Sequence, residues 1–227
     1  MKKLRVMPIF GTRPDAVKMA PLVKELKKCP EIETIVTVTA QHRQMLDQVL
    51  NIFGIEPDHD LNIMQDRQTL EQIASRALEG LSAVFDRYIP DLVLVHGDTS
   101  TCFVAALAAF YRKIPVGHVE AGLRTFDKYS PFPEEMNRKL TAALADLHFA
   151  PTGTNKANLL NEGVREDKIY VTGNTVIDAL KTTVSKDYEF QSEELKKIDL
   201  RGKRVITVTA HRRENLGRPL EQICLAL

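Results

Sequence analysis

Short apolar runs alternate along this chain with longer segments whose apolar residues recur at the spacing of an α-helix. The apolar runs fall at residues 4–10, 34–40, 90–98, 114–122, 147–151, 168–173 and 204–210. Each has the length of a strand, and the most apolar of them fit strands that are buried on both faces. This alternation predicts an α/β protein built on a parallel sheet that helices cover.

Sequence signals for helix ends support the alternation. Pro14 fits the first turn of a helix after the first strand, and Gly54 fits the end of a helix over 44–53. Thr69 and Gln72 have the spacing of a capping box, which predicts the start of a long helix toward residue 88. Further helices are expected over 100–112 and 133–145, and near 155–162.

The pattern of strands and helices stops near residue 180. We assign 1–180 to an N-terminal domain and 181–203, which is charged and poorly periodic, to a linker. The strand predicted at 204–210 and the start of a helix then open a C-terminal domain over 204–227. One strand and one helix cannot bury a core, so we expect a truncated or partly covered form of a longer protein. Its tail is expected to expose Val205, Ile206, Val208, Ile223 and Leu225.

Composition and charge exclude several classes of binding partner. The 227 residues are 44% hydrophobic and 27% charged, as in an ordinary folded domain. Lys and Arg number 31 against 30 Asp and Glu, which favours neither a nucleic-acid surface nor a polybasic membrane anchor. Cys29, Cys102 and Cys224 form no C-x-x-C pair, and no apolar segment reaches the roughly 20 residues of a membrane span. We therefore expect a cytoplasmic protein.

Polar side chains follow four of the predicted strands. They are Thr12 and Arg13, His96 and Asp98, His118 and Glu120, and His211 with Arg212, Arg213 and Glu214. Glu134 begins the helix that follows a further loop. Because ligands of open α/β sheets bind beyond the carboxyl ends of the strands, we expect a site where these residues meet.

Arg13 is a candidate anion ligand. It lies at the N-terminus of the first helix, where free N–H groups and the helix dipole favour an anion, and its guanidinium can add two hydrogen bonds to a phosphate. The alternative is an ordinary surface arginine in a turn. The segment lacks the G-x-G-x-x-G pattern of a dinucleotide site.

The carboxylates Asp98, Glu120 and Glu134 are candidates for acid–base chemistry. Side by side they would repel one another and raise the pKa of at least one of them. The first two residues could instead be helix caps. With His96 and His118 they could also hold a divalent metal, although no recognised metal spacing results.

Six motifs together resemble one family. They are GTRPDA, HGDT, GHVEAGLRT, PFPEEMNR, TGNTVID and HRREN, and they span essentially the whole chain. In this order and at about these separations they resemble the non-hydrolysing UDP-N-acetylglucosamine 2-epimerases. Asp15 departs from the more usual Glu of GTRPEA, a change expected to matter little.

The resemblance implies a fold and a reaction. The fold is of the glycosyltransferase-B type, with two Rossmann-like halves that close on a nucleotide sugar. The reaction interconverts UDP-N-acetylglucosamine and UDP-N-acetylmannosamine by eliminating UDP to 2-acetamidoglucal and adding it back, with no metal and no redox cofactor. The product would supply cell-surface polysaccharide or teichoic acid synthesis, and a homodimer is expected.

The resemblance also implies site residues. Asp98, Glu120, Glu134 and His211 match catalytic positions, and Arg13 matches a residue that contacts the diphosphate. Which carboxylate takes the proton from carbon 2 stays open. Polar residues of QHRQ and DRQ resemble contacts to a second, regulatory UDP-N-acetylglucosamine; these are Gln41, Gln44, Arg67 and Gln68. Ordinary loop residues are the alternative for this set.

Two other functions fit part of the pattern. A glycosyltransferase of the same architecture would bind a UDP-sugar but gives no reason for the carboxylates. A non-catalytic sensor of nucleotide sugars could keep Arg13 and lose the acids.

Overall fold

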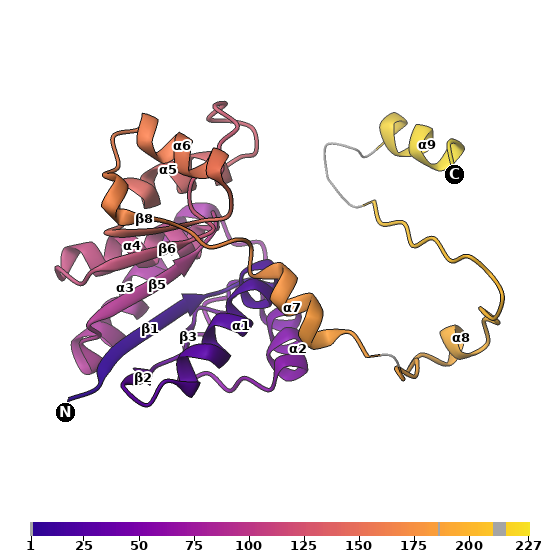
Figure 1. Cartoon of the computed structure of the whole chain (residues 1–227), viewed down its shortest axis with the longest axis horizontal. Coiled ribbons are helices and arrows are strands. Elements are labelled where there is room, and N and C mark those ends of the chain that lie inside the picture. Colours follow the sequence, from indigo (N-terminus) through magenta and orange to yellow (C-terminus); the bar gives the residue numbers. More distant parts are fainter. Residues whose placement is uncertain (1, 186, 211–216) are drawn as a thin grey trace. The chain divides into compact units, whose positions relative to one another are not determined.

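The structure, a computed structural model, describes residues 2–185, 187–210 and 217–227 (Figure 1). The chain divides into two units, residues 1–184 and 185–227. The domain boundaries expected from the sequence stay predictions.

The first unit is built on a parallel sheet of eight strands within the described residues. The strands are β1 (Leu4–Phe10), β2 (Ile32–Thr34), β3 (Thr37–Val38), β4 (His59–Asp60), β5 (Leu92–His96), β6 (Val116–Val119), β7 (Leu147–Ala150) and β8 (Ile169–Val171). Their order is β4-β3-β1-β5-β6-β7-β8, and β2 also pairs with β1. The register sets Val6 opposite Leu92 and Val93 opposite Val116. The α/β class with a parallel sheet is thus confirmed.

Helices connect the strands and cover the sheet. They are α1 (Arg13–Lys28), α2 (Arg43–Phe53), α3 (Leu70–Tyr88), α4 (Ser100–Tyr111), α5 (Glu134–Leu144), α6 (Gly153–Asn161), the 3₁₀ turn η1 (Glu166–Lys168) and α7 (Val176–Thr183). Successive side chains of a strand point to opposite faces. Val6 and Phe10 of β1 therefore pack with α1, α2 and α7, while Met7 and Ile9 pack with α3 and α4.

The predicted helix signals are found at the helix ends. Thr69 accepts a hydrogen bond from the Gln72 backbone N–H and Gln72 returns one, so the capping box at the start of α3 is confirmed. Gly54 follows α2 in the left-handed conformation, with φ of 61°. In that region an L side chain is strained, so glycine suits the position.

One predicted strand is divided. Residues 34–40 were expected to be continuous, but β2 and β3 pair separately with the two halves of β1. Between them the Val36 N–H donates to the Asp58 carboxylate at 2.7 Å. Because a side chain takes this donor, the strand is interrupted there.

The order of the strands reverses at β1. The chain runs from β1 outward to β3 and β4, then crosses back so that β5 pairs with β1 on its other side. Ligands of such sheets bind at this switch point, beyond the carboxyl ends of the strands. The segments after β1 and β5 carry Thr12, Arg13 and Asp98, so the fold sets these predicted residues at the switch point.

The second unit holds α8 (Glu193–Lys196) and α9 (Arg218–Leu225). The strand predicted at 204–210 is wrong: these residues have no strand pairing in the structure. A strand needs a neighbour for its N–H and C=O groups, and the described part of this unit offers none. Val205 and Ile206 are exposed as expected, at 55% and 74%.

Within the described residues, every helix is too short or too polar to cross a membrane.

Candidate functional site

A cavity of about 270 Å³ lies beyond the strand ends at the switch point. It is lined by Thr12, Pro14, Gln41, His42, Leu70, Asp98, Thr99, Ser100, Pro133, Glu134 and Asn137. We call it the strand-end cavity. It brings two of the predicted carboxylates, Asp98 and Glu134, to one space beside the start of α1.

The start of α1 is suited to an anion. Thr12 is the N-cap, but its side chain makes no capping hydrogen bond. Its hydroxyl oxygen is buried and has no partner within the described residues, although the residue lines the cavity. The exposed Arg13 follows directly. A buried hydroxyl and a helix N-terminus next to a free-standing guanidinium are groups that bind phosphate.

Asp98 is held by the helix α5. Its Oδ2 accepts from Arg138 Nε at 3.0 Å and from Nη2 at 2.7 Å, and its backbone carbonyl accepts from Asn137 at 2.8 Å. The capping alternative for Asp98 is wrong, since Thr99 caps α4 by accepting from the Cys102 N–H. Asp98 is thereby free to present its remaining oxygen to the cavity.

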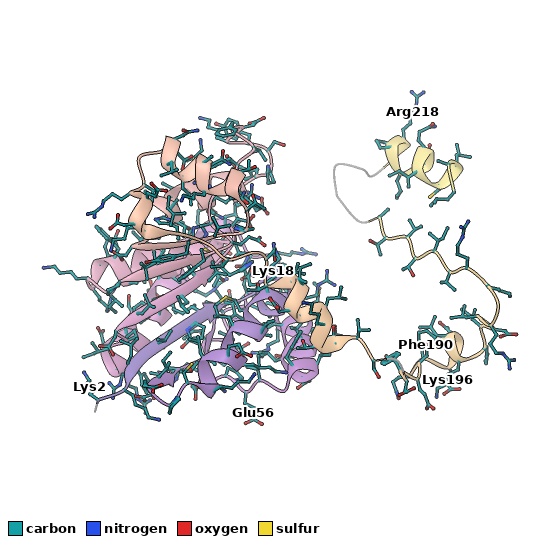
Figure 2. The ribbon with its side chains drawn as sticks, viewed as in Figure 1. Lys2, Lys18, Glu56, Phe190, Lys196 and Arg218 are labelled. Carbon is teal, nitrogen blue, oxygen red and sulfur yellow. The ribbon has the colours of Figure 1, made fainter. Side chains whose placement is uncertain are left out.

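Glu120 is bound by two side chains from other elements. Lys18 Nζ donates to its two oxygens at 2.7 and 2.6 Å, and Asn174 Nδ2 donates to Oε2 at 2.7 Å. Lys18 projects from α1, where it is labelled in Figure 2. Glu120 has a positive φ of 62° and no helix follows it directly, so it is no cap either.

Repulsion between the carboxylates does not determine the pKa of Glu120. Burial raises the pKa of Glu120, but His96, Lys18 and Asn174 outweigh that effect and lower the pKa from its ordinary value. The expectation of a raised pKa is therefore wrong for Glu120. Each carboxylate forms an ion pair with a basic side chain: Glu120 with Lys18, and Asp98 with Arg138.

Two neighbouring acids at the start of α5 have different surroundings. Glu134 is half-buried and lines the strand-end cavity. Glu135 is fully buried and accepts the backbone N–H groups of Thr125 and Phe126, both at 3.1 Å, together with Arg138 at 3.2 Å. Glu135 thus connects the loop before α5 to Arg138, which in turn binds Asp98.

The two histidines at the strand ends are both buried. His118 donates from Nε2 to the Gly97 carbonyl at 2.8 Å, and burial lowers its pKa to about 3, so it is neutral and structural. His96 lies between Asp15 and Glu120. Within the described residues, no three acidic, histidine or cysteine side chains gather as metal ligands would.

The structure brings two of the four predicted regulatory residues, Gln41 and Gln68, together at the strand-end cavity. Gln41 is buried, lines it, and accepts from Thr101 at 3.0 Å. Gln68 donates to the Gln41 carbonyl at 3.2 Å and accepts from Arg76 at 2.7 Å. Gln44 and Arg67 are exposed. His211, the fourth predicted catalytic residue, lies outside the described residues.

Several residues of the site were not singled out from the sequence. Lys18, Arg138 and Asn174 supply the counter-groups of Asp98 and Glu120. Arg138 and Asn174 belong to motifs of the resemblance, PFPEEMNR and TGNTVID, which was a usable signal. Lys18 had no such sequence signal, because a single lysine on an amphipathic helix is usually a surface residue.

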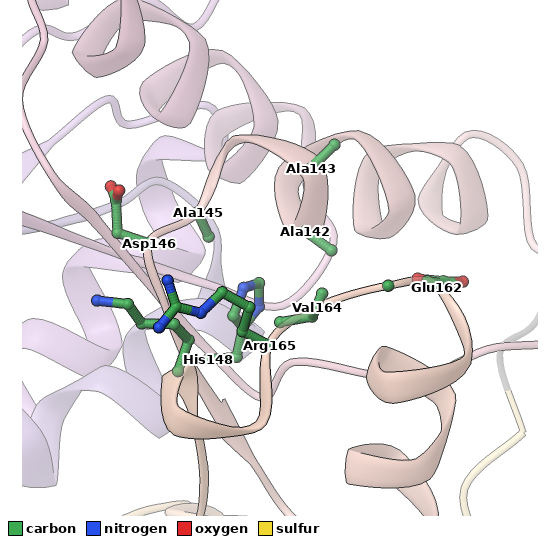
Figure 3. A pocket seen from close by; sticks show the side chains of 10 residues that line it. Ala142, Ala143, Ala145, Asp146, His148, Glu162, Val164 and Arg165 are labelled. Carbon is green, nitrogen blue, oxygen red and sulfur yellow. The ribbon is translucent and has the colours of Figure 1, made fainter.

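A second cavity, of about 380 Å³, lies where β7 begins and contains none of the predicted site residues. Asp146 and Glu162 lie on opposite sides of it in Figure 3. Glu162 is paired with the buried side chain of Arg124, at 2.6 Å. Arg124, from the motif GHVEAGLRT, is therefore held in an ion pair outside the strand-end cavity.

A parallel sheet whose switch point brings a helix N-terminus and two carboxylates to one cavity has the architecture of the Rossmann-like α/β proteins. The sequence model of the UDP-N-acetylglucosamine 2-epimerase family matches residues 24–227, so the chain belongs to that family.

Known proteins agree with this assignment. The UDP-N-acetylglucosamine 2-epimerase of Bacillus subtilis is 62% identical over 228 residues, which cover 100% of this chain and 59% of that protein. The Staphylococcus aureus protein MnaA, solved with UDP, is 54% identical with a TM-score of 0.87, over 98% of this chain and 57% of that one. The Neisseria meningitidis UDP-GlcNAc 2-epimerase bound to UDP-GlcNAc is 57% identical with a TM-score of 0.75, over 78% and 49%.

The fold itself is shared more widely. A lipopolysaccharide outer core galactosyltransferase is 13% identical with a TM-score of 0.54, a likeness of fold alone. The Rossmann-like sheet is thus that of the glycosyltransferase-B-like fold of the epimerases. The chain spans about 60% of the length of the curated relatives it matches.

Proposed function

We propose that this chain carries the carboxylate-bearing part of a UDP-N-acetylglucosamine 2-epimerase, which interconverts UDP-N-acetylglucosamine and UDP-N-acetylmannosamine. The observation that carries the proposal is the strand-end cavity. In it Asp98 and Glu134 face the anion-binding start of α1, in a chain 62% identical to an epimerase. The relatives solved with UDP and with UDP-GlcNAc support a nucleotide-sugar ligand.

The carboxylates suit elimination and re-addition of UDP. As the bond from carbon 1 to the diphosphate breaks, positive charge develops at carbon 1 and the ring oxygen, and a nearby carboxylate stabilises it. The proton at carbon 2 is barely acidic while UDP is attached, and a base must remove it as 2-acetamidoglucal forms. The lowered pKa of Glu120 makes it a weaker base and a more persistent anion, which favours charge stabilisation over removal of the proton.

We assign the other residues by position. Arg13 and the start of α1 would hold the diphosphate, whose charge leaves with UDP. Asp98 and Glu134 would face the sugar, and His211 would complete the catalytic set. No metal or redox cofactor enters this assignment. The downstream use in cell-surface polysaccharide or teichoic acid synthesis, a homodimer and a cytoplasmic location stay predictions.

Deuterium incorporation tests the function. UDP-N-acetylglucosamine is incubated in deuterated water with the 227-residue chain, and in parallel with a chain lengthened by the part of the relatives that these residues do not cover. Deuterium at carbon 2 together with UDP-N-acetylmannosamine supports the epimerase. Sugar transfer to an acceptor would indicate a glycosyltransferase, and binding without exchange in both chains would indicate a sensor.

A further inference from the structure

His96 is a buried imidazole with a carboxylate at each ring nitrogen. Its Nδ1 lies 3.9 Å from Asp15 Oδ1, and its Nε2 lies 3.8 Å from Glu120 Oε2. The residue is 3% exposed. Neither nitrogen has a hydrogen-bond partner within the described residues, and a carboxylate oxygen lies just beyond hydrogen-bond distance of each.

This arrangement favours one protonation state of the ring. A neutral imidazole has one N–H and one nitrogen lone pair. In a buried site the lone pair, where the neutral ring carries partial negative charge, would face a carboxylate, and this repulsion is poorly screened there. A ring with an N–H on both sides is attracted to Asp15 and to Glu120 at once.

We propose that His96 is a positioning residue whose imidazole carries the proton shared between Asp15 and Glu120, and so holds Glu120 as a carboxylate aimed at the strand ends. The catalytic consequence rests on the proposed function, in which Glu120 acts on the sugar. The proton placement does not.

The groups around the ring are consistent with this role. From α1, Asp15 is fixed by the Gly11 N–H at 3.4 Å and the Thr99 hydroxyl at 3.1 Å. From the same helix Lys18 binds Glu120. On β6, His118 is neutral, with a pKa lowered to about 3 by burial.

The remaining neighbours add no unpaired charge near the His96 ring. Asn174, after β8, is uncharged and binds Glu120, and Asp98, after β5, is directed to Arg138. His96 is the largest of the influences that lower the pKa of Glu120 against the effect of burial.

The first test reads the protons directly in the 227-residue chain. Nitrogen-15 NMR of His96 at pH 7 is expected to show both ring nitrogens protonated. Carbon-13 NMR of the Glu120 carboxyl is expected to show its pKa raised by about one unit in His96→Gln, a tenfold loss of acidity. A single N–H on the ring in the wild type, or an unchanged Glu120 titration in His96→Gln, would overturn the proposal.

Matched variants separate positioning from packing. Asp15→Asn removes one carboxylate and is expected to remove the second ring proton, whereas Asp15→Glu, which keeps the charge, is expected to retain it. His118→Gln is the control for loss of a buried imidazole, since it should lower stability without moving the Glu120 pKa. If His96→Gln does not fold, the wild-type ring spectrum and the two Asp15 variants decide the question.

The second test uses the reaction. In whichever chain exchanges deuterium, His96→Gln should slow exchange most in acid and move the acid limb of the pH profile upward by about the one unit by which the Glu120 pKa rises. A uniform slowing with an unmoved limb counts against the proposal. If no wild-type chain exchanges deuterium, the proposed function fails, and the NMR measurements still decide the role of His96.

Discussion

At the scale of single residues, neighbours decide what a carboxylate can do. Glu120 and Glu135 are both acids with a basic partner, Lys18 for one and Arg138 for the other. Glu135 is fully enclosed and also binds two backbone N–H groups, which leaves it no capacity for a ligand. Glu120 lies at the strand ends with partners from side chains alone, so it can exchange one of them for a substrate.

Glu120→Gln tests this difference. In the complete, longer enzyme we expect turnover to fall about a hundred- to ten-thousandfold, or roughly 3–5 kcal/mol of barrier, because a neutral amide neither takes a proton nor stabilises positive charge. Deuterium incorporation at carbon 2 measures it, and circular dichroism checks folding. Glu33→Gln, in an exposed pair with Arg5, is the matched control. Turnover close to that of the control would remove Glu120 from the mechanism.

Lys18→Met tests the origin of the lowered Glu120 pKa. A carboxyl whose pKa is lowered in the folded state contributes stability that is present above its unfolded pKa and is lost as pH falls through the folded pKa. The variant should therefore lose stability at neutral pH, and its difference from the wild type should shrink in acid. Urea denaturation across pH measures this. Lys28→Met, in an exposed pair with Glu25, should show little change at any pH; equal behaviour of the two variants would contradict the assignment.

At the scale of elements, local signals predicted what depends on local contacts. The capping box at Thr69 and the glycine after α2 act within one helical turn, and the structure has both. The interruption between β2 and β3 depends on Asp58, which lies 22 residues from Val36. The strand expected at 204–210 had the right composition but lacks a paired neighbour. Pairing is a property of the fold, which periodicity does not reveal.

The same reason limits prediction of the site. Asp98 and Glu120 follow the neighbouring strands β5 and β6, and that much was predicted from the pattern. The partners Lys18 and Arg138 are separated from their carboxylates by 102 and 40 residues. Only the packing of α1 and α5 against the sheet brings them there, so the sequence suggested repulsion where the structure has ion pairs.

Glu135→Ala tests the tie between α5 and its preceding loop. The substitution leaves two backbone N–H groups without their acceptor and removes one of the two carboxylate partners of Arg138, which keeps Asp98. We therefore expect a loss of about 1–3 kcal/mol in unfolding free energy. Glu166→Ala breaks an exposed pair with Lys156 and should cost about 1 kcal/mol or less. Urea denaturation compares them, and similar losses would show that Glu135 is not a structural tie.

The α2 and Arg67 region carries the regulatory prediction. If a second UDP-N-acetylglucosamine binds there, the reverse reaction from pure UDP-N-acetylmannosamine should be slow until a trace of UDP-N-acetylglucosamine is added. Arg67→Ala should raise the concentration of UDP-N-acetylglucosamine that is needed to end the lag. Arg165→Ala, which breaks an exposed pair with Asp167, should leave that concentration unchanged. Progress curves measure the lag. Hyperbolic kinetics without a trace effect would exclude the regulatory site.

At the scale of the whole molecule, the chain spans about 60% of the length of its curated relatives. We predict that UDP binds the 227-residue chain weakly and that this chain shows no epimerase activity. A chain with the additional segment should bind UDP more tightly and turn over. Calorimetric titration of both, with uridine as the control ligand, makes the comparison. Equal affinity and turnover would show that the nucleotide site lies within the present residues.

The carboxylate of Glu135 has a consequence for how this molecule can change over evolutionary time. It accepts the backbone N–H groups of Thr125 and Phe126, which lie 10 and 9 residues before it. These hydrogen bonds join the two ends of the loop that runs from Phe126 to Glu135. Lengthening a loop that is already closed costs little, about 0.6 kcal/mol for each doubling. Insertions and deletions within 127–132 should therefore be accepted without moving Arg138 or Asp98. We expect that stretch to be where related sequences differ most in length, around a base that stays the same.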